Sequence, residues 1–325
     1  MSTSAVYDLV LLLMSAEVDE SRRAAAFQEL IEQPVTADCL AEAARALRDR
    51  MTPVELSAEA IDTCGTGGSG KRTFNTSTLS AFVIAAAGGR VAKHGNRSAS
   101  GNCGGCDLLE RLGAAIDLGP DQERRIFDSL GIVFLHAARH HAALRRVAPL
   151  RKAHGKRTVF NYLGPLCNPA NVRTQLMGAG NSEASGLLAD CLRRDPTKRA
   201  VVATGDDGLD EVTVVTATTI RSIEAGRVTE ARFSPESLGL PLFSHRAIEG
   251  GTADENAATF LSLAAGRADD AKKTLVLVNA AHGLQLAGVA PSLSDAYGLA
   301  SETLASGRVL DLLNRYCRLS NELSQ

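Results

Sequence analysis

The residues best suited to chemistry in this sequence lie in two glycine-rich segments and one acidic segment. The first glycine-rich segment is 65–70 (GTGGSG), and 75–78 (NTST) follows it closely. Glycines let a backbone approach a ligand, free N–H groups at a helix start bind anions, and the hydroxyls of Ser77 and Thr78 can reach a phosphate or a metal. The spacing matches neither a Walker loop nor a dinucleotide fingerprint. A glycine cluster alone is more often a tight turn before a capped helix.

The second glycine-rich segment is 93–101 (KHGNRSASG), which continues to Gly104 and Gly105. It brings together two cations, an amide, a histidine and hydroxyls after an expected strand. Ligands of open α/β sheets bind at the carboxyl ends of strands, so both segments should share one rim. Between Asp62 and Asp107 there are five cations and no acid. This pairing suits a ligand with more than one phosphate.

The acidic segment 206–211 (DDGLDE) holds four carboxylates that repel one another unless a cation compensates them. Mg²⁺ is commonly bound by one or two carboxylates together with substrate phosphates. A solvent-exposed Asp-Gly turn explains the segment equally well. A second window without acids, 129–182, contains eight cations and reads as a solvated basic face or as a site for an anion.

Other cysteines and histidines give weaker signals. Cys103 and Cys106 form a CxxC pair, but zinc needs further ligands at motif spacing, so small residues filling a glycine-rich loop are the favoured interpretation. His136, His140 and His141 have no acid partner nearby in the sequence, and we expect them to be packing or surface residues.

Composition indicates a folded protein with two domains. The chain has 325 residues, a formal charge of −2, 45% hydrophobic and 22% charged residues. This balance excludes a disordered chain and gives no overall reason to expect nucleic-acid or membrane binding. The apolar run 9–14 is short and followed by acids, which favours a helix over a signal peptide. Seven cysteines, an odd number, predict reduced thiols in a cytoplasm.

Periodicity predicts the elements that must position these segments. Residues 4–52 look helical and end at Thr52-Pro53, after which strands and helices alternate. The expected strands are 60–64, 90–93, 132–135, 199–204 and the pair 212–223 and 227–233. The expected helices are 78–87, 107–118, 121–130, 183–194, 255–265, 271–286 and 293–323. This alternation predicts an α/β fold with a largely parallel sheet.

Taken together, the segments closely resemble the anthranilate phosphoribosyltransferase family, which belongs to the nucleoside-phosphorylase-like (type III) phosphoribosyltransferases. The matching motifs run in the family's order over nearly the whole chain. They are DTCGTGG and NTST, KHGNR, DLLERLG, RTVFNYLGPLCNPA, DDGLDE, NAA at 256–258 and VNAA at 278–281.

The resemblance implies a small, mainly helical domain beside a larger α/β domain with a central, mostly parallel sheet. The helical domain would span 1–58 and be completed by a segment near 155–180, and the α/β domain would span 59–325. Substrates would be 5-phosphoribosyl diphosphate and anthranilate, used with Mg²⁺ in tryptophan biosynthesis. The implied assembly is a homodimer joined through the helical domains.

By similarity, three groups of residues would form the site. Lys93 and His94 are the implied catalytic residues. The implied contacts of 5-phosphoribosyl diphosphate are Gly65, Gly68, Ser69, Thr73, Asn75, Thr76, Ser77, Thr78, Lys93, Gly95, Asn96, Arg97, Ser100, Gly101 and Gly105. The implied anthranilate contacts are Gly65, Asn96 and Arg151. The implied Mg²⁺ ligands are Ser77, Asp210 and Glu211.

The chain departs from the family pattern at several positions. Ser69 stands where the family usually has Asp, segment 100–104 has fewer hydroxyls, and Ala137-Ala138 and His141-Ala142 replace Ala-Pro and His-Pro. A related aromatic acid as acceptor therefore stays open. Two further alternatives are a pyrimidine nucleoside phosphorylase, which shares the fold but needs no metal, and an inactive relative that binds nucleic acid. With 4% aromatic residues the chain offers few side chains for base stacking.

Overall fold

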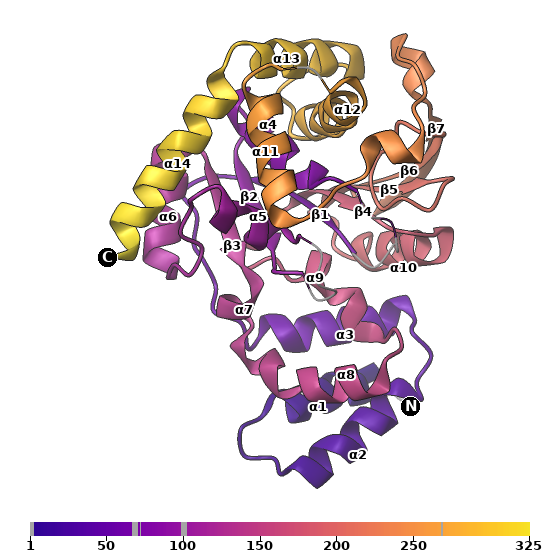
Figure 1. Cartoon of the computed structure of the whole chain (residues 1–325). Helices are drawn as coiled ribbons and strands as arrows, with labels where there is room; N and C mark the ends of the chain where they lie inside the picture. The colour runs from indigo at the N-terminus through magenta and orange to yellow at the C-terminus, as the bar shows by residue number, and fades with distance from the viewer. Residues whose placement is uncertain (1–2, 67–70, 72, 99–102, 268) are drawn as a thin grey trace.

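The computed structural model describes residues 3–66, 71, 73–98, 103–267 and 269–325. A helical part lies beneath a larger α/β part (Figure 1). The helical part consists of α1 (Thr3–Met14), α2 (Glu20–Ile31), α3 (Ala37–Arg48) and α8 (Ala148–His154). Side-chain caps begin two of these helices, because Asp19 accepts the N–H of Arg22 and Thr36 accepts the N–H of Cys39.

The α/β part is built on one seven-stranded sheet with the order β3-β2-β1-β4-β5-β6-β7. The first five strands in this order are parallel, and the last two pair antiparallel. The strands are β1 (Ile61–Gly65), β2 (Val91–Gly95), β3 (Ile132–His136), β4 (Thr174–Gly178), β5 (Arg199–Gly205), β6 (Thr218–Glu224) and β7 (Arg227–Phe233). The predicted α/β class with a mostly parallel sheet is confirmed.

Two strand predictions differ from the structure. Strand β4 is absent from the predicted strands, although it lies between β1 and β5 in the centre of the sheet. Strand β6 begins at Thr218, so residues 212–217 form a loop instead of the start of a strand. In that loop the N–H of Thr213 donates to the hydroxyl of Thr218 at 3.1 Å, which folds the segment back on the strand.

Helices cover both faces of the sheet. Helices α4 (Thr76–Ala86) and α12 (Asp270–Leu286) pack on one face against β1 and β4, and α10 (Ser182–Leu192) packs on the other against β5 and β6 (Figure 1). The remaining helices of this part are α5 (Gly105–Arg111), α6 (Pro120–Leu130), α7 (Ala137–His140), α11 (Ala253–Ala264), α13 (Leu293–Ala305) and α14 (Arg308–Ser324). The short helix α9 (Leu163–Leu166) packs against α3 of the helical part. The single helix predicted over 293–323 is two helices, because Gly307 adopts a φ of 79° between them.

Two hydrophobic cores hold the molecule together. One lies between the sheet and α4, α11, α12 and α14. The other joins the N-terminal helices to Phe160, Leu163 and Leu166 and continues to α10 beneath the sheet. The central segment thus packs on the N-terminal helices up to about Cys167, whereas 174–178 belong to the sheet. The domain boundaries themselves stay a prediction.

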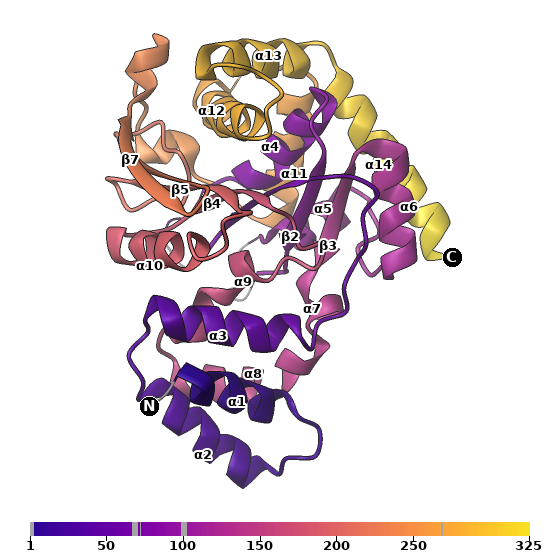
Figure 2. The ribbon, with the colours of Figure 1, turned by 180° about the vertical axis from the view of Figure 1, so that it is seen from behind.

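The connection between the two parts runs along the outside of the α/β part. After α3 the chain climbs beside β3 before it enters β1 (Figure 2). Its backbone is tied down on the way, since the N–H of Thr52 donates to the carbonyl of His140 and that of Val54 to the carbonyl of Pro169. None of the described helices combines the length and apolar character that crossing a membrane would require.

Candidate active site

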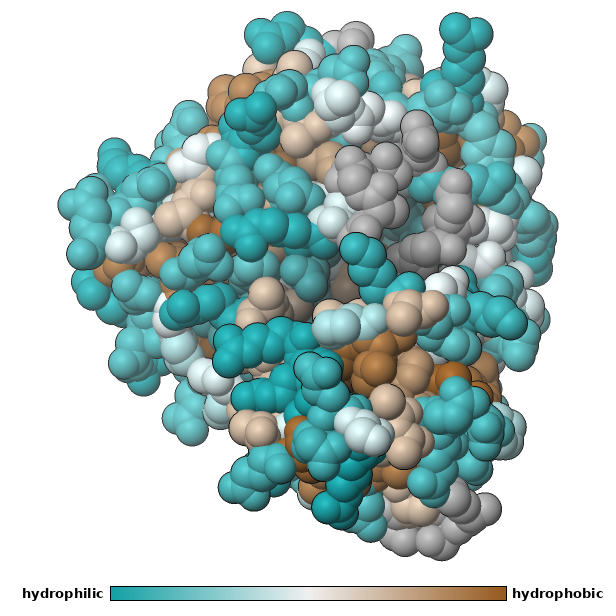
Figure 3. Space-filling view, turned by 60° about the horizontal axis from the view of Figure 1, so that its bottom comes forward, coloured by the Kyte–Doolittle hydropathy of each residue, from teal (hydrophilic) through white to brown (hydrophobic). Residues whose placement is uncertain are grey.

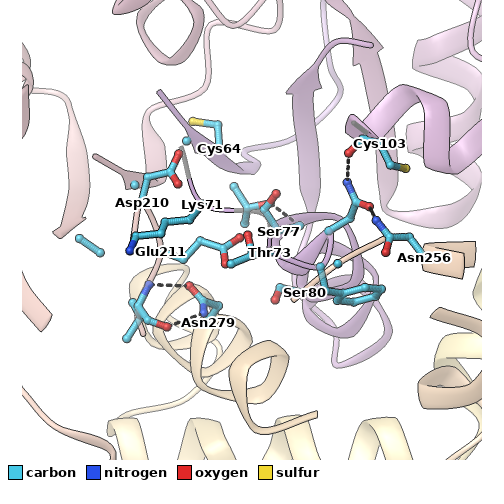
Figure 4. Close-up of a pocket in the computed structure, with 18 of the residues that line it drawn as sticks. Cys64, Lys71, Thr73, Ser77, Ser80, Cys103, Asp210, Glu211, Asn256 and Asn279 are labelled. Atoms are coloured by element: carbon cyan, nitrogen blue, oxygen red, sulfur yellow. Dashed lines mark hydrogen bonds between the residues drawn. The ribbon is translucent and has the colours of Figure 1, made fainter. Parts of the chain in front are cut away.

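A pocket of about 530 Å³ opens where β1 and β4 end and α4 begins. Parts of the chain that are far apart in sequence contribute to its wall (Figure 4). The residues predicted as site residues that line it are Gly65, Thr73, Asn75, Ser77, Asp210 and Glu211. The predicted convergence of the first glycine-rich segment and the acidic segment is therefore seen in the structure.

The four carboxylates of the acidic segment divide into two pairs. Asp206 forms an ion pair with Arg232 on β7, and Asp207 accepts hydrogen bonds from the Leu209 N–H and the Thr213 hydroxyl. Asp210 and Glu211 line the pocket instead. The exposed-turn interpretation thus fits Asp206 but not Asp207, whose side chain is 4% exposed, and the second pair is placed where a cation in the pocket could be bound.

Glycines at the ends of β1 and β4 bring the acidic segment close to the sheet. Gly65 and Gly178 are register partners in the parallel pairing of these strands. A Cβ on Gly178 would lie 1.6 Å from the carbonyl oxygen of Asp210, and one on Gly65 would lie 3.0 Å from its Oδ2. Any larger residue at 178 would push the segment away. Sequence reasoning missed Gly178 because it missed β4, and a glycine ending a strand was the signal available.

Glu211 is the most strongly perturbed carboxylate of the pocket. Burial and the neighbouring charge of Asp210 raise its pKa to about 8, although it accepts hydrogen bonds from the Thr76 hydroxyl and the Ser77 backbone N–H. Its Oε2 atom is buried and has no hydrogen-bond partner among the described residues. Two adjacent carboxylates with an unsatisfied buried oxygen fit a divalent cation, which would replace the missing partner. Within the described ranges, no cluster of three His, Cys, Asp or Glu side chains is placed to hold a metal by itself.

The start of α4 forms the other wall of the pocket. The Asn75 side chain donates to the carbonyl of Cys103 at 2.8 Å, which ties this helix start to the end of the second glycine-rich segment. Thr76 and Thr78 are buried. A Cβ on Gly105 would lie 3.2 Å from the Thr78 hydroxyl, so α5 also begins against α4. The first turn of α4 contains no acid, so its positive end is suited to an anion, although Glu211 accepts the Ser77 N–H and the Thr76 and Thr78 N–H groups bond to the carbonyls of Phe74 and Asn75.

Lys93 and His94 lie at the end of β2, behind the pocket. Lys93 is buried, and its ammonium donates to the carbonyl of Thr63 on β1. Its positive charge opposes the rise in the pKa of Glu211 that burial and Asp210 cause. The buried carboxylate of Asp62 accepts the backbone N–H of His94 at 3.1 Å and thereby holds the β2 end against β1.

The His94 ring is buried and uncharged near neutral pH. Burial, reinforced by His141, lowers its pKa to about 3. The ring centroids of His94 and His141 are 5.1 Å apart. Nδ1 of His94 lies 3.0 Å from the carbonyl of Gly164, which assigns the ring proton to Nδ1. Nε2 is then an acceptor, and it has no hydrogen-bond partner among the described residues.

Asn96 and Arg97 follow Gly95, the last residue of β2. The carbonyl of Asn96 accepts the Cys106 N–H at the start of α5. The Arg97 guanidinium forms ion pairs with Glu110 at 2.7 Å and Asp117 at 3.4 Å. The side chain predicted to bind a phosphate is thus neutralised by two carboxylates in this structure.

Arg151 lies on α8, in the helical part. Its guanidinium is above the Phe160 ring, 5.6 Å from the centroid, and burial lowers its pKa. Among the described residues no carboxylate is within ion-pair distance of it. A half-buried arginine without a carboxylate is suited to an anionic ligand. Four other predicted site residues lie outside the described residues: Gly68, Ser69, Ser100 and Gly101.

Two of the three remaining candidate histidines have acid partners that the sequence did not indicate. His136 lies 2.8 Å from Asp117 and His140 lies 2.9 Å from Glu123, so two of the three histidines do have acid partners. They are buried, as expected for packing residues. Sequence distance concealed these pairs, because the carboxylates come from different elements. All seven cysteines are free, and burial raises the pKa of the Cys106 thiol to about 12.

Two asparagines of the pocket belong to the NAA motifs, which by themselves assign them no role. Asn256 on α11 and Asn279 on α12 are both buried and both line the cavity. Each uses its side-chain amide to hold backbone or side-chain groups of pocket segments. The signal available in the sequence was a polar residue that interrupts an otherwise apolar helix face.

Comparisons with known proteins agree with this geometry. The family model described as "Glycosyl transferase family, a/b domain" matches residues 57–310. An anthranilate phosphoribosyltransferase of Moorella thermoacetica is 41% identical over 297 residues, covering 91% of this chain and 87% of the relative. One of Thermomicrobium roseum is 44% identical over 286 residues, covering 86% and 82%.

Solved structures show the same fold. The anthranilate phosphoribosyltransferase of Thermus thermophilus superposes with a TM-score of 0.90 at 36% identity, over 99% of this chain and 96% of that one. The Saccharomyces cerevisiae enzyme, solved in complex with PRPP and Mg, superposes with a TM-score of 0.90 at 24% identity, over 99% and 94%.

Proposed function

We infer that this chain, which belongs to the glycosyl transferase family and within it to the anthranilate phosphoribosyltransferases, transfers the phosphoribosyl group of 5-phosphoribosyl diphosphate (PRPP) to the amine of anthranilate. Diphosphate is released, and the reaction belongs to tryptophan biosynthesis. The observation that carries this inference is the pocket itself. It sets two adjacent carboxylates beside the positive end of α4, whose first turn contains no acid, so it can hold phosphates and a divalent cation together.

The chemistry asks the protein mainly for positioning and charge stabilisation. Displacing diphosphate from an anomeric carbon proceeds through an oxocarbenium-like state while negative charge grows on the leaving group. The positive end of α4 would stabilise that charge, and the buried Lys93 ammonium, which donates to the carbonyl of the pocket residue Thr63, would add positive charge from behind the wall. The attacking aromatic amine is neutral near pH 7, so it needs no strong base. His94 would be neutral during the reaction, but its Nε2 is buried and the ring is not part of the pocket lining, so we assign it no contact with the amine.

Mg²⁺ fits the residues at the acidic wall of the pocket. Asp210 and Glu211 would hold it together with the Ser77 hydroxyl, since all three line the same cavity. When bound, the ion supplies positive charge that neutralises the phosphate oxygens. Its charge would also remove the repulsion between Asp210 and Glu211 that raises the pKa of Glu211.

The acceptor would bind between the α/β part and the helical part. Arg151 would pair with the ring carboxylate, and Gly65 and Asn96 would contact the rest of the molecule. Support comes from the half-buried Arg151 guanidinium, for which the described residues provide no carboxylate partner. Arg97 would have to share its ion pairs with Glu110 and Asp117 to reach a phosphate.

The decisive experiment follows anthranilate fluorescence with purified protein, PRPP and Mg²⁺. Loss of fluorescence that requires all three components supports the function. A panel of substituted benzoic acids run beside it tests whether a related aromatic acid is the better acceptor. Turnover of thymidine with phosphate in the presence of EDTA, and none of anthranilate, would identify a nucleoside phosphorylase instead.

We also propose a homodimer formed through the helical part, in the cytoplasm. Helix α1 buries Val10 and Leu13 in the second core, while Leu11 and Leu12 on the same helix stay partly exposed. Apolar surface gathers over this part of the molecule (Figure 3). Light scattering should give twice the chain mass, and Leu12→Asp should halve it, whereas Asp8→Asn should not. The seven free thiols support a reducing compartment.

A further inference from the structure

Two buried asparagines approach the pocket from two different helices. Asn256 on α11 is 3% exposed and Asn279 on α12 is 6% exposed. Figure 4 shows them at separate places on the wall, Asn279 beside Glu211 and Asn256 beside Cys103. Buried polar side chains are retained only where they satisfy hydrogen bonds, so the partners of each amide indicate its task.

Asn279 holds the backbone of the residue after Glu211. Its Oδ1 accepts the N–H of Val212 at 3.0 Å, and its Nδ2 donates to the carbonyl of Val212 at 2.9 Å. Nδ2 also donates to the carbonyl of Leu275 at 2.8 Å, which locks the amide to its own helix. Both polar backbone groups of Val212 are therefore held by one side chain. Because the peptide bond between Glu211 and Val212 is rigid, this restricts the position of the Glu211 backbone, from which its carboxylate extends.

Asn256 holds a different set of segments. Its Oδ1 accepts the N–H of Gly251 at 2.8 Å, and its Nδ2 donates to Oδ1 of Asn75 at 2.9 Å. Asn75 in turn donates from Nδ2 to the carbonyl of Cys103 at 2.8 Å. This relay connects residue 251, the start of α4 and the end of the second glycine-rich segment. It sets the part of the wall suited to anions.

The two hydrogen-bond sets share no residue. One amide holds the backbone next to the Glu211 carboxylate, and the other holds the residue before α4, Asn75, which in turn bonds to Cys103. An amide is suited to both places because it supplies a donor and an acceptor without adding charge beside phosphates or a cation. A carboxylate at either position would lose the donor, and an ammonium would lose the acceptor.

We propose that Asn279 and Asn256 are positioning residues that divide the site between them: Asn279 orients the metal-binding wall, and Asn256 orients the phosphate-binding wall. The inference rests on the proposed function, because the two walls have these tasks only if a metal and a diphosphate bind. It assigns separate effects on the two ligands to two residues of the same type.

The test compares Asn279→Ala and Asn256→Ala with Asn181→Ala as a matched control. Asn181 caps α10 through a hydrogen bond to the Ala184 N–H and does not line the pocket. Asn279→Ala should raise the apparent dissociation constant for the divalent cation about tenfold or more, the range typical of residues that orient metal ligands. Its KM for PRPP at saturating Mg²⁺ should stay unchanged.

Asn256→Ala should show the opposite pattern. Its KM for PRPP should rise about tenfold, as expected when a buried hydrogen-bond relay loses its centre, while its requirement for the divalent cation stays unchanged. Asn181→Ala should alter thermal stability alone. Asn256→Ser and Asn279→Ser replace the amide by a hydroxyl and provide a second pair of variants if either alanine variant fails to fold.

Binding measurements without turnover separate this inference from the proposed function. Free Mn²⁺ measured by electron paramagnetic resonance reports the metal wall, and calorimetry with inorganic diphosphate reports the anion wall. If the wild type is inactive but Asn279→Ala weakens only Mn²⁺ binding and Asn256→Ala weakens only diphosphate binding, the transferase function is rejected and the division of roles is kept. Variants that weaken both ligands equally, or change only stability as Asn181→Ala does, would overturn the division.

Discussion

Replacing Glu211 by Gln should make the stability of the metal-free chain less dependent on pH. The pKa of Glu211 is about 8 in the folded chain and ordinarily 4.5. Between these values the folded chain holds a proton that the unfolded chain has lost. The contribution is therefore complete below pH 4.5 and disappears as the pH rises to 8. The free energy of unfolding of the wild type should fall between pH 4.5 and pH 8 as this contribution is lost, and Glu211→Gln should show no such fall from residue 211.

The magnitude follows from the distance between the two pKa values. The step from 4.5 to about 8 corresponds to about 5 kcal/mol in full. Glu211 is only partly covered from solvent, although its Oε2 is buried, so we expect about 2 kcal/mol after screening. Urea unfolding of both proteins at pH 5 and pH 8, in buffers with a chelator, measures the difference directly.

Added Mg²⁺ provides the control for this prediction. At pH 8 the ion should restore stability to wild type and leave Glu211→Gln nearly unaffected, because binding stabilises the state that binds. Parallel pH profiles for the two metal-free proteins would refute the reasoning. They would mean that burial and the charge of Asp210 do not raise the pKa of the Glu211 carboxyl.

Three further perturbations test other parts of the molecule. Arg151→Ala should raise the KM for anthranilate about thirtyfold and leave the KM for PRPP unchanged, because truncating one partner of a buried charge pair costs about 2 kcal/mol or more. Equal effects on both KM values would remove Arg151 from the acceptor site. Gly178→Ala should abolish Mg²⁺-dependent turnover by displacing the Asp210 backbone, whereas Gly298→Ala, whose added Cβ meets nothing within 4 Å, should retain wild-type rates; normal turnover by the first variant contradicts the assignment. Burial lowers the pKa of His282 to about 4, so its contribution to stability is complete above pH 6.5 and is lost as the pH falls to 4. In urea unfolding, His282→Gln should therefore lose less stability than the wild type as the pH falls. Equal losses of stability in the two proteins would show that burial does not hold the His282 ring neutral.

Several elements could be predicted because their signals are local. Strand β1 lies within one residue of its predicted bounds, since a short strand-like segment that ends at a glycine has few other solutions. Strand β4 ends at a glycine, which is its one local signal, and that signal alone does not distinguish a strand from a loop. Residues 212–217 have strand-like composition, yet they form a loop because the Val212 backbone bonds to Asn279 instead of a neighbouring strand.

The residue types and their order along the chain by themselves determined the fold class, the pairing of glycine-rich and acidic segments, and the chemistry these segments favour. Such properties depend on local periodicity and on side-chain type. Only the tertiary structure decided that Asp210 and Glu211, and not Asp206 and Asp207, face the pocket. It also decided that Glu211 has a raised pKa and that Asn279 holds its neighbour. Burial and hydrogen bonding across 67 residues of chain depend on how distant segments pack, and no local pattern contains that information.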